Sequence, residues 1–578
     1  MKKIFLLLAL LATGLNLSAG PIGEMRARQI AEAFFATSAT RSAGALELEW
    51  AGDNISEPTT RAGSDNALLY IYTRGTSDGF VIVAGDDNIA PIIGYSFDTT
   101  FDSENMAEAT EAIINAWAEQ VSAARAGNIP ANSTAATRYS TELLYDTALW
   151  NQYEPYNLEA PKVDGDKSVT GCVATAMSII CYYNKWPEKG VGTTPAYSYD
   201  DSYGHTHYVA ANTLGRTYDY ANMLFDYDNG YNTAQGEAVA ALMKDMGTAV
   251  KMNYHPEGSG ALDFDVVTAF INHFSYSKQT TLVSRNGYTA TEWHNTMRTN
   301  LKQYGPTYFS GMSNRGGHAF VVDGYASDDY FHFNFGWGGV GNGFFRMPEI
   351  EYYADQMTLL YLEPDKDGSS KYRDNLQLYA LELSSGDVMR GITSLAKKHT
   401  ANKTFQVMIG GYLNCGARAF NGEIALVQCD KDGEWKQKLF STNVTDLSIM
   451  SYNYYNYYVD VTISNIEEGD VMRLYFKSDD SDEWQWARAY SAEALNEILL
   501  CAPPEQVAEN LKFLYSKTEN KIYLLAPHAY QIDFDNGTGS DSFTGYTQSA
   551  IPSSMLGKGE HTIKVSFSGE PYVLKLKL

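Results

Sequence analysis

Residues 170–177 read Thr-Gly-Cys-Val-Ala-Thr-Ala-Met, and they begin the helix on which the interpretation of the chain depends. Apolar residues recur at helical spacing from Cys172 to about Asn184, where Trp186-Pro187 ends the pattern. Cys172 therefore stands in the first helical turn, where free backbone N–H groups and the helix dipole are expected to stabilise a thiolate and lower the thiol pKa. Taken alone, the segment is also typical of a small buried cysteine in a core helix.

A second segment places a histidine at the start of an apolar strand. Residues 315–325 read Arg-Gly-Gly-His-Ala-Phe-Val-Val-Asp-Gly-Tyr, with two glycines before His318. An imidazole on a strand beside a glycine-lined cleft can accept the Cys172 proton and later protonate the leaving amine. A structural histidine at a strand end has the same local pattern.

A third segment supplies a candidate orienting group for this histidine. Residues 331–339 read Phe-His-Phe-Asn-Phe-Gly-Trp-Gly-Gly. Asn334 is predicted to hydrogen-bond the distal nitrogen of His318, and Trp337 to shield that bond from water. A glycine-rich aromatic hairpin is the structural alternative. The order Cys, His, Asn along the chain is the order found in papain-like proteases.

With these segments in order, the chain resembles the streptopain family of bacterial cysteine proteases. The matching stretches are Trp150–Asn157, Gly171–Met177, Gly316–Gly324 and Asn334–Gly339 with Gly343–Arg346. The resemblance spans residues ~21–363. It implies an α+β chain with a papain-like catalytic domain over residues 139–363, and a cysteine endopeptidase that hydrolyses peptide bonds through an acyl-enzyme.

The resemblance also implies roles for individual residues. Cys172 matches the nucleophile and His318 the general base and acid. Gln152 matches the side chain that lines the oxyanion hole together with the backbone N–H of Cys172, a donor that contributes ~3 kcal/mol in the transition state. Gly317 and Ser259 match the walls of the substrate cleft. Asn334 and Trp337 complete the candidate catalytic set.

Two further implications concern the substrate cleft. Family members usually carry Trp where this chain has Phe335, so another aromatic ring is expected to fill that space. A hydrophobic substrate residue two positions before the scissile bond is expected, since none of the matched cleft residues is charged. Protein or peptide substrates are the expected partners.

Residues 20–138 are expected to form a small α+β pro-domain, with helices over 27–35 and 107–124 and strands over 68–72 and 80–84. This unit resembles the pro-domain of the family. The resemblance implies a zymogen in which the pro-domain covers the cleft and acts as an intramolecular inhibitor. A permanent accessory domain is the alternative. The small, polar residues 126–137 predict an exposed linker that is cut during maturation.

Residues 1–19 are typical of a secretory signal peptide. Lys2 and Lys3 precede the apolar run Ile4–Ala12, and small residues follow, with cleavage expected near Ala19. No other stretch approaches the ~18 consecutive apolar residues that a spanning helix needs. The mature protein is expected to be secreted or otherwise extracytoplasmic, in the periplasm or at the cell surface, with no membrane span.

Length and charge limit the remaining classes of function. The 578 residues predict several domains, and a net charge of −26 argues against nucleic acid as a partner. Neither a His-Glu-x-x-His nor a Cys-x-x-Cys motif occurs, so no metal and no cofactor is predicted. His205 and His207 are compatible with a metal site but are more typical of loop histidines.

The five cysteines rule out a scaffold built on disulfides, and an odd number leaves at least one thiol unpaired. Cys415 and Cys429 are compatible with a disulfide that their spacing alone does not establish.

After a charged linker, residues 372–502 alternate strand-like runs with turns and predict a β-sandwich, and residues 506–578 predict a small C-terminal β domain. These all-β domains leave open a different function, in which they make the chain a surface-binding or adhesion protein with a secondary or inactive peptidase domain. The presence of Cys172, His318 and Gln152 together favours the peptidase. A papain-fold transferase such as a transglutaminase is a third alternative, against which the four matched stretches argue.

Overall fold

The computed structural model describes most of the chain between residues 20 and 501 and the backbone of seven strands beyond it. The described residues are 20–37, 44–55, 66–75, 78–103, 106, 108–125, 139–201, 203–313, 316–327, 329–347, 356–382, 388–394, 396, 399–453, 458–491, 494–501 and the strands between 512 and 577. The predicted signal peptide and most of the predicted linker lie outside them.

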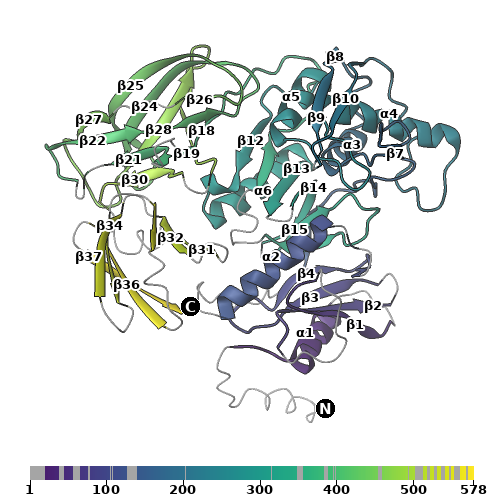
Figure 1. Cartoon of the computed structure of the whole chain (residues 1–578), viewed down its shortest axis with the longest axis horizontal. Helices are drawn as coiled ribbons and strands as arrows, with labels where there is room; N and C mark the ends of the chain where they lie inside the picture. The colour runs from purple at the N-terminus through teal and green to yellow at the C-terminus, as the bar shows by residue number, and fades with distance from the viewer. Residues whose placement is uncertain are drawn as a thin grey trace, which may run out of the picture.

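The N-terminal unit packs two helices against four antiparallel strands (Figure 1). Its helices are α1 (Glu24–Thr37) and α2 (Glu108–Arg125). Its strands are β1 (Leu46–Gly52), β2 (Leu69–Arg74), β3 (Phe80–Ala84) and β4 (Ile92–Ser96), paired in this order. Both helices and the strands β2 and β3 were predicted, whereas β1 and β4 were not.

The central unit contains the remaining strands of the same sheet and four α-helices. Its sheet strands are β5 (Thr141–Leu144), β12 (Thr281–Ser284), β13 (Thr307–Ser313), β14 (Gly316–Ala326), β15 (Tyr330–Asn334), β16 (Gly343–Arg346) and β17 (Met357–Leu360). Its helices are α3 (Cys172–Asn184), α4 (Thr233–Ala249), α5 (Asp263–His273) and α6 (Ala290–Tyr304). Helix α3 has the predicted bounds, and its C-cap residue Lys185, with a φ of +48°, leaves the helical region.

A single antiparallel sheet joins the two units. Strand β4 pairs with β16 through the partners Tyr95–Phe344 and Gly94–Phe345, so the sheet runs β1-β2-β3-β4-β16-β15-β14-β13-β17-β12. Gly94 permits this close approach, because a Cβ there would lie 2.4 Å from the Phe345 ring. The N-terminal unit is therefore built into the sheet of the central unit through backbone pairing.

The two faces of β14 contact different helices. Ala319 and Val321 face the core that contains α3, whereas Phe320 and Val322 share a core with Trp117 of α2. This separation follows from the alternation of side chains along a strand. The N-terminal helix α2 thus packs on the side of β14 opposite to the helix that begins with Cys172.

The C-terminal region is rich in antiparallel β-structure. A five-stranded sheet runs β25-β24-β28-β29, with β30 paired to β28, and its apolar residues form a separate core. The strands are β24 (Phe420–Cys429), β25 (Trp435–Leu447), β28 (Val471–Ser478), β29 (Gln485–Trp486) and β30 (Glu497–Leu499). Smaller sheets surround this one.

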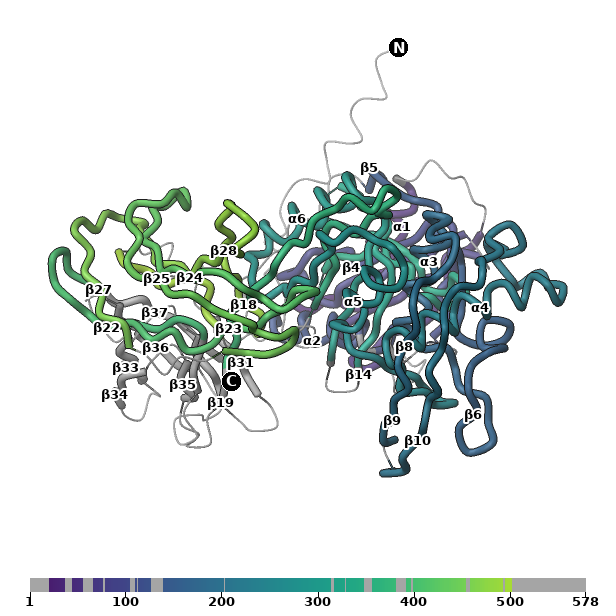
Figure 2. Tube along the Cα trace, turned by 90° about the horizontal axis from the view of Figure 1, so that it is seen from above, coloured from purple at the N-terminus to yellow at the C-terminus, as the bar shows by residue number. Residues whose placement is uncertain are grey.

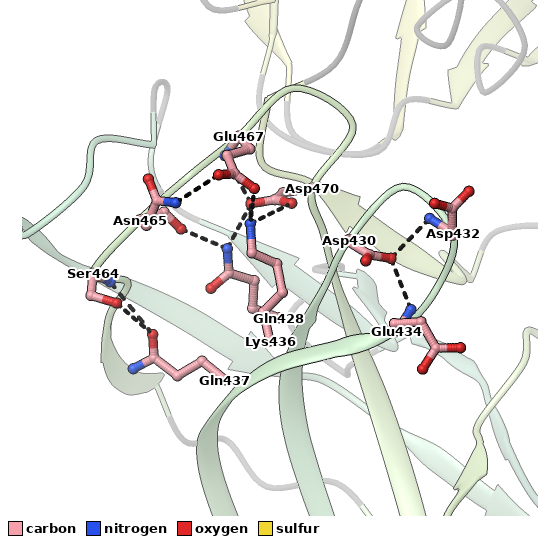
Figure 3. A network of polar contacts seen from close by, with 10 residues as sticks. All are labelled: Gln428, Asp430, Asp432, Glu434, Lys436, Gln437, Ser464, Asn465, Glu467 and Asp470. Atoms are coloured by element: carbon pink, nitrogen blue, oxygen red, sulfur yellow. Dashed lines mark hydrogen bonds and ion pairs between the residues drawn. The ribbon is translucent and has the colours of Figure 1, made fainter.

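A network of polar contacts joins strands and loops of this β-rich domain (Figure 3). The Lys436 ammonium donates to Glu467 at 2.7 Å and to Asp470 at 2.9 Å, and Gln428 donates to Asp470 at 2.7 Å. The Asp470 side chain is 1% exposed, so these donors satisfy a buried charge.

The same domain contacts the central unit through Arg488. Its guanidinium donates to the Gly287 carbonyl at 2.8 Å and lies over the Tyr288 ring at 4.4 Å.

Two small sheets complete the chain. One contains β31 (Lys512–Ser516), β32 (Lys521–Leu525) and β35 (Gln548–Ile551); the other contains β33 (Tyr530–Asp535), β34 (Ser540–Gly545), β36 (Glu560–Phe567) and β37 (Glu570–Lys577). All five cysteines are free thiols, so Cys415 and Cys429 do not form a disulfide. Among the described residues, no helix has the length and apolar character needed to cross a membrane.

Candidate active site

The backbone at Gly171 brings Cys172 to the start of α3. Gly171 caps the helix with φ +86°, a conformation that favours glycine. A Cβ at this position would lie 2.7 Å from Met252 Sδ and 2.9 Å from the Ser259 carbonyl oxygen. Glycine is therefore required here for two reasons, and it places the half-buried Cys172 beside the 252–260 loop.

The Cys172 thiol contacts backbone N–H groups of its own helix and of β14. Burial raises its pKa, while hydrogen bonds from the backbone of Ala319 and Val173 act in the opposite direction and the charge of Asp263 adds to the increase. The sequence predicted a lowered pKa from the helix start alone. In the intact chain desolvation outweighs the helix terminus, so the group is held as a neutral thiol.

His318 lies in β14 and is 4% exposed. Its Nε2 lies 3.0 Å from the Phe335 carbonyl oxygen, which can only accept a hydrogen bond. Nε2 is therefore the protonated nitrogen, and Nδ1 keeps the lone pair that a general base needs. Burial lowers the pKa of His318 to about 4, so the imidazole of the intact chain is neutral near pH 7.

The predicted hydrogen bond from Asn334 to His318 is replaced by the bond to the Phe335 carbonyl. Asn334 donates to Thr147 Oγ1 at 2.9 Å and to the Ala148 carbonyl at 3.0 Å. Its oxygen accepts from the Gly336 N–H at 3.2 Å.

Strand register explains this correction. Asn334 is the partner of Val321 across β14 and β15, so it shares the face of Val321. His318 is an odd number of residues from Val321 and belongs to the opposite face, with Phe320. Asn334 instead orders the turn that presents the Phe335 carbonyl.

Aromatic rings surround His318 on its own face. Its ring stacks on that of Trp337 at a centroid distance of 6.2 Å and an interplanar angle of 22°, and it also contacts Phe320 and Phe335. The Trp337 Nε1 is buried and has no hydrogen-bond partner among the described residues. Trp337 is thus placed beside the imidazole, and the Phe335 ring fills the adjacent space in the core.

Gln152 is connected to the start of α3 through the backbone. It is 4% exposed, and its carbonyl accepts from the Thr170 N–H at 3.1 Å, two residues before Cys172. Within the described residues, its side-chain amide forms no hydrogen bond with the protein. The amide donors of Gln152 are therefore not used within the described part of the protein and are available to a ligand.

The two predicted cleft residues differ in their environments. Ser259 is buried, and its hydroxyl donates to the Val169 carbonyl at 2.8 Å and accepts from the His255 N–H at 2.9 Å. Its side chain therefore braces the loop, and its backbone faces Gly171. Gly317 is exposed, and a Cβ there would lie 3.1 Å from Met312 Sδ.

Sequence reasoning missed Asp263, the first residue of α5. Its carboxylate accepts from the Tyr308 hydroxyl at 2.5 Å and the Ser310 hydroxyl at 2.9 Å, both on β13. Burial raises its pKa, and its charge acts on Cys172. The sequence offered only an acidic residue at a helix start, which is too common a feature to mark a site.

Comparison with known proteins bears on the whole N-terminal two-thirds of the chain. A model of the peptidase C10 family matches residues 150–345, and a model of the Spi protease inhibitor family matches residues 19–121. Thiol protease/hemagglutinin PrtT of Porphyromonas gingivalis is 33% identical over 394 residues, which cover 63% of this chain and 44% of PrtT. Streptopain of Streptococcus pyogenes is 32% identical over 368 residues, which cover 60% of this chain and 91% of streptopain.

Two solved structures from Prevotella intermedia are also similar. A prointerpain A fragment with an alanine in place of a cysteine is 25% identical with a TM-score of 0.45, and the match covers 57% of this chain and all of that chain. Active interpain A is 29% identical with a TM-score of 0.34, over 41% of this chain and 98% of that chain.

Proposed function

We propose that Cys172 is the nucleophile and His318 the general base of this chain, which belongs to the peptidase C10 family and is a cysteine peptidase made as a zymogen. The observation that carries this assignment is that Cys172 begins the helix packed on β14, the strand that holds His318, and that the thiol meets the backbone of Ala319. The contact with Ala319 places the thiol against the strand residue that follows His318. In the intact chain the His318 ring lies on the opposite face of β14, with Phe320, and no contact between the imidazole and the thiol is present among the described residues.

In each step of the proposed reaction, a named group donates or accepts the proton that is transferred. In the processed chain, once the His318 ring faces Cys172, its Nδ1 accepts the Cys172 proton, and Sγ attacks the carbonyl carbon of the scissile peptide. The Gln152 amide and the Cys172 N–H donate to the resulting oxyanion. When the intermediate collapses, the C–N bond breaks and imidazolium protonates the leaving amine. Water, deprotonated by His318, then cleaves the thioester to release a carboxylate and the free thiol.

The Phe335 carbonyl has a positioning role in this proposal. It accepts the Nε2–H of His318 and so keeps Nδ1 available as the base. Asn334 supports it by ordering the turn through Gly336. Trp337 covers the imidazole from one side.

Inhibition of peptide hydrolysis by thiol reagents tests the proposed chemistry. The processed chain should cleave denatured protein substrates in reducing buffer and lose activity after alkylation with iodoacetamide. A metal chelator should not abolish hydrolysis, because no proposed step uses a metal. Full activity after complete alkylation of Cys172 would contradict the mechanism.

Contacts of the N-terminal inhibitor-like domain support the proposal that this domain keeps the peptidase inactive within the same chain. Thr99 Oγ1 donates to the Asn342 carbonyl at 2.5 Å, and the Gly341 N–H donates to the Thr100 carbonyl at 3.2 Å. Both contacts hold the segment that follows Trp337. We propose that this docking keeps the His318 face buried, so that both catalytic groups stay neutral until the N-terminal domain leaves.

Maturation is predicted to cut the chain within residues ~126–142. This stretch is small and polar and follows α2, where an exposed linker is the preferred site of proteolysis. N-terminal sequencing of the active form should place its first residue in this window. A stable and fully active chain that still begins near Gly20 would contradict the prediction.

We also propose a hydrophobic preference two positions before the scissile bond. Burial of an apolar side chain contributes ~1.5–3 kcal/mol, or about ten- to hundredfold in kcat/KM if it is realised in the transition state. The exposed Met312 beside Gly317 offers an apolar wall for such a pocket.

Profiling the processed enzyme with a peptide library that varies this position tests the preference. We expect Leu, Ile, Val and Phe peptides to be cleaved about tenfold or more faster than Asp and Lys peptides. A preference for a charged residue would show that the pocket has been assigned to the wrong residues, and it would direct attention to Asp263.

The first 19 residues support export as part of the same proposal. Their charged start, apolar run and small residues near Ala19 have the pattern that a secretion machinery removes. We propose that the zymogen is exported and becomes active outside the cytoplasm.

A further inference from the structure

Two short hairpins of the protease domain meet away from the catalytic residues. One joins β6 (Lys162–Val163) to β7 (Asp166–Lys167), and the other joins β9 (Tyr197–Asp200) to β10 (Thr206–Val209). Figure 2 shows them projecting side by side from the protease domain. Asp164 lies in the turn of the first hairpin, and it approaches the turn of the second.

The second hairpin contributes a carboxylate and two imidazoles. His207 Nε2 lies 2.9 Å from Asp201 Oδ2, and His205 Nδ1 lies 3.2 Å from the same oxygen. One ligand atom from each of Asp164, Asp201 and His207 lies within 4.8 Å of the other two. Ligand atoms at ~2.1 Å from a tetrahedral zinc ion lie ~3.4 Å apart, so movements of up to about 1.4 Å, within the reach of side-chain rotation, close the set.

The Asp201 carboxylate is surrounded by donors, but none of those in the described part of the chain comes from a lysine or arginine. Its side chain is 3% exposed, and it accepts from the backbone N–H groups of Tyr203 and His205 and lies beside the imidazoles of His205 and His207. Among the described residues, its ion-pair partners are His205 and His207. Asp164 adds a second carboxylate to this cluster, and a divalent ion would balance the two negative charges.

We propose that Asp164, Asp201 and His207 bind one divalent transition-metal ion of the zinc class, with His205 or water available as a fourth ligand. Two carboxylates and an imidazole match the donors that zinc accepts, and the two negative charges balance the ion. An imidazole ligand disfavours calcium and magnesium, which prefer oxygen. Sequence spacing suggested only a histidine pair; the structure adds Asp164 from a separate hairpin.

Such an ion would have a structural effect on the cleft. The Tyr197 hydroxyl donates to the Met252 carbonyl at 2.8 Å, and the Tyr199 hydroxyl donates to the Tyr254 carbonyl at 2.6 Å. The hairpin β9–β10 therefore braces the loop that lies against Gly171. An ion shared with the β6–β7 hairpin would fix this loop from outside, without contact with the reacting atoms.

Zinc titration of the full-length chain tests the proposal. The chain carries Cys172→Ala, which removes the catalytic thiol as a ligand and prevents self-processing, and binding is followed by competition with a chromogenic chelator. We expect one zinc equivalent, and an affinity about tenfold or more lower in Asp164→Asn. Asp164 has φ +53°, which asparagine adopts readily, so this variant should fold.

Asp166→Asn is the matched control, because Asp166 is exposed on the same hairpin and lies outside the cluster. Its zinc affinity should equal that of the parent. Hydrogen exchange gives a second measurement: zinc should slow exchange of the backbone amides of residues 197–209 in the parent and not in Asp164→Asn.

Three results would overturn the site. In the first, the parent binds no zinc. In the second, zinc binds equally well to the parent, Asp164→Asn and His207→Gln. In the third, zinc binding disappears only when the remaining thiols are alkylated. Calcium that binds as tightly as zinc would contradict the assigned donor chemistry.

Discussion

Cys172→Ala is expected to abolish both peptide hydrolysis and self-processing, with a loss of at least ~10⁴-fold in kcat/KM. The variant removes the sulfur that forms the acyl-enzyme, and no neighbouring group can replace it. The measurement is the rate of appearance of the processed chain, together with hydrolysis of a peptide substrate after separate removal of the N-terminal domain.

Cys181→Ala is the matched control for this variant. Cys181 lies on the same helix, is fully buried and packs in the core that contains α3. Its replacement should lower stability while most activity is retained. Processing by purified Cys172→Ala at the parental rate would remove Cys172 from the mechanism.

Gln152→Ala is expected to lower kcat by about 10²- to 10³-fold with little change in KM. Gln152 is 4% exposed and its side-chain amide has no hydrogen-bond partner in the described part of the chain, so its donors are free for an oxyanion that exists only in the transition state. Steady-state kinetics of the processed enzyme measure this effect.

Gln152→Glu tests the donor itself, because it keeps the shape of the side chain and replaces the N–H groups with a negative oxygen. It should be at least as inactive as Gln152→Ala while the chain keeps its cooperative thermal unfolding. A higher KM at an unchanged kcat would place Gln152 in ground-state substrate binding instead.

Local patterns of the sequence were sufficient to predict the elements that carry the candidate catalytic groups. Helix α3 begins at Cys172 and ends at Asn184 as predicted, because apolar spacing and the Trp-Pro stop are local signals. His318 lies on an apolar strand, as its flanking residues predicted. For the C-terminal domains, the sequence predicted β-strands. An adhesive role of these domains stays a prediction.

Features that depend on long-range pairing could not be predicted in the same way. The face that Asn334 occupies follows from its register with Val321, and the continuous sheet follows from the pairing of β4 with β16. No local pattern specifies either pairing. The proximity of Asp164 to His207 likewise depends on the packing of two hairpins.

The pKa of the Cys172 thiol is another property that the local sequence could not predict. The helix start at Cys172 predicted a lower pKa, and burial in the intact chain raises it instead. Desolvation depends on every segment that packs around the group, including segments far away in the sequence.

Covalent labelling with an epoxide-type inhibitor of thiol proteases tests most directly that Cys172 is the nucleophile of a latent peptidase. The full-length chain and the processed chain are labelled in parallel, and the modified residue is identified by peptide mapping. We expect stoichiometric labelling of Cys172 in the processed chain and much slower labelling in the full-length chain, whose thiol and imidazole are neutral. Labelling of another cysteine, or equally fast labelling of Cys172 in both chains, would contradict the account.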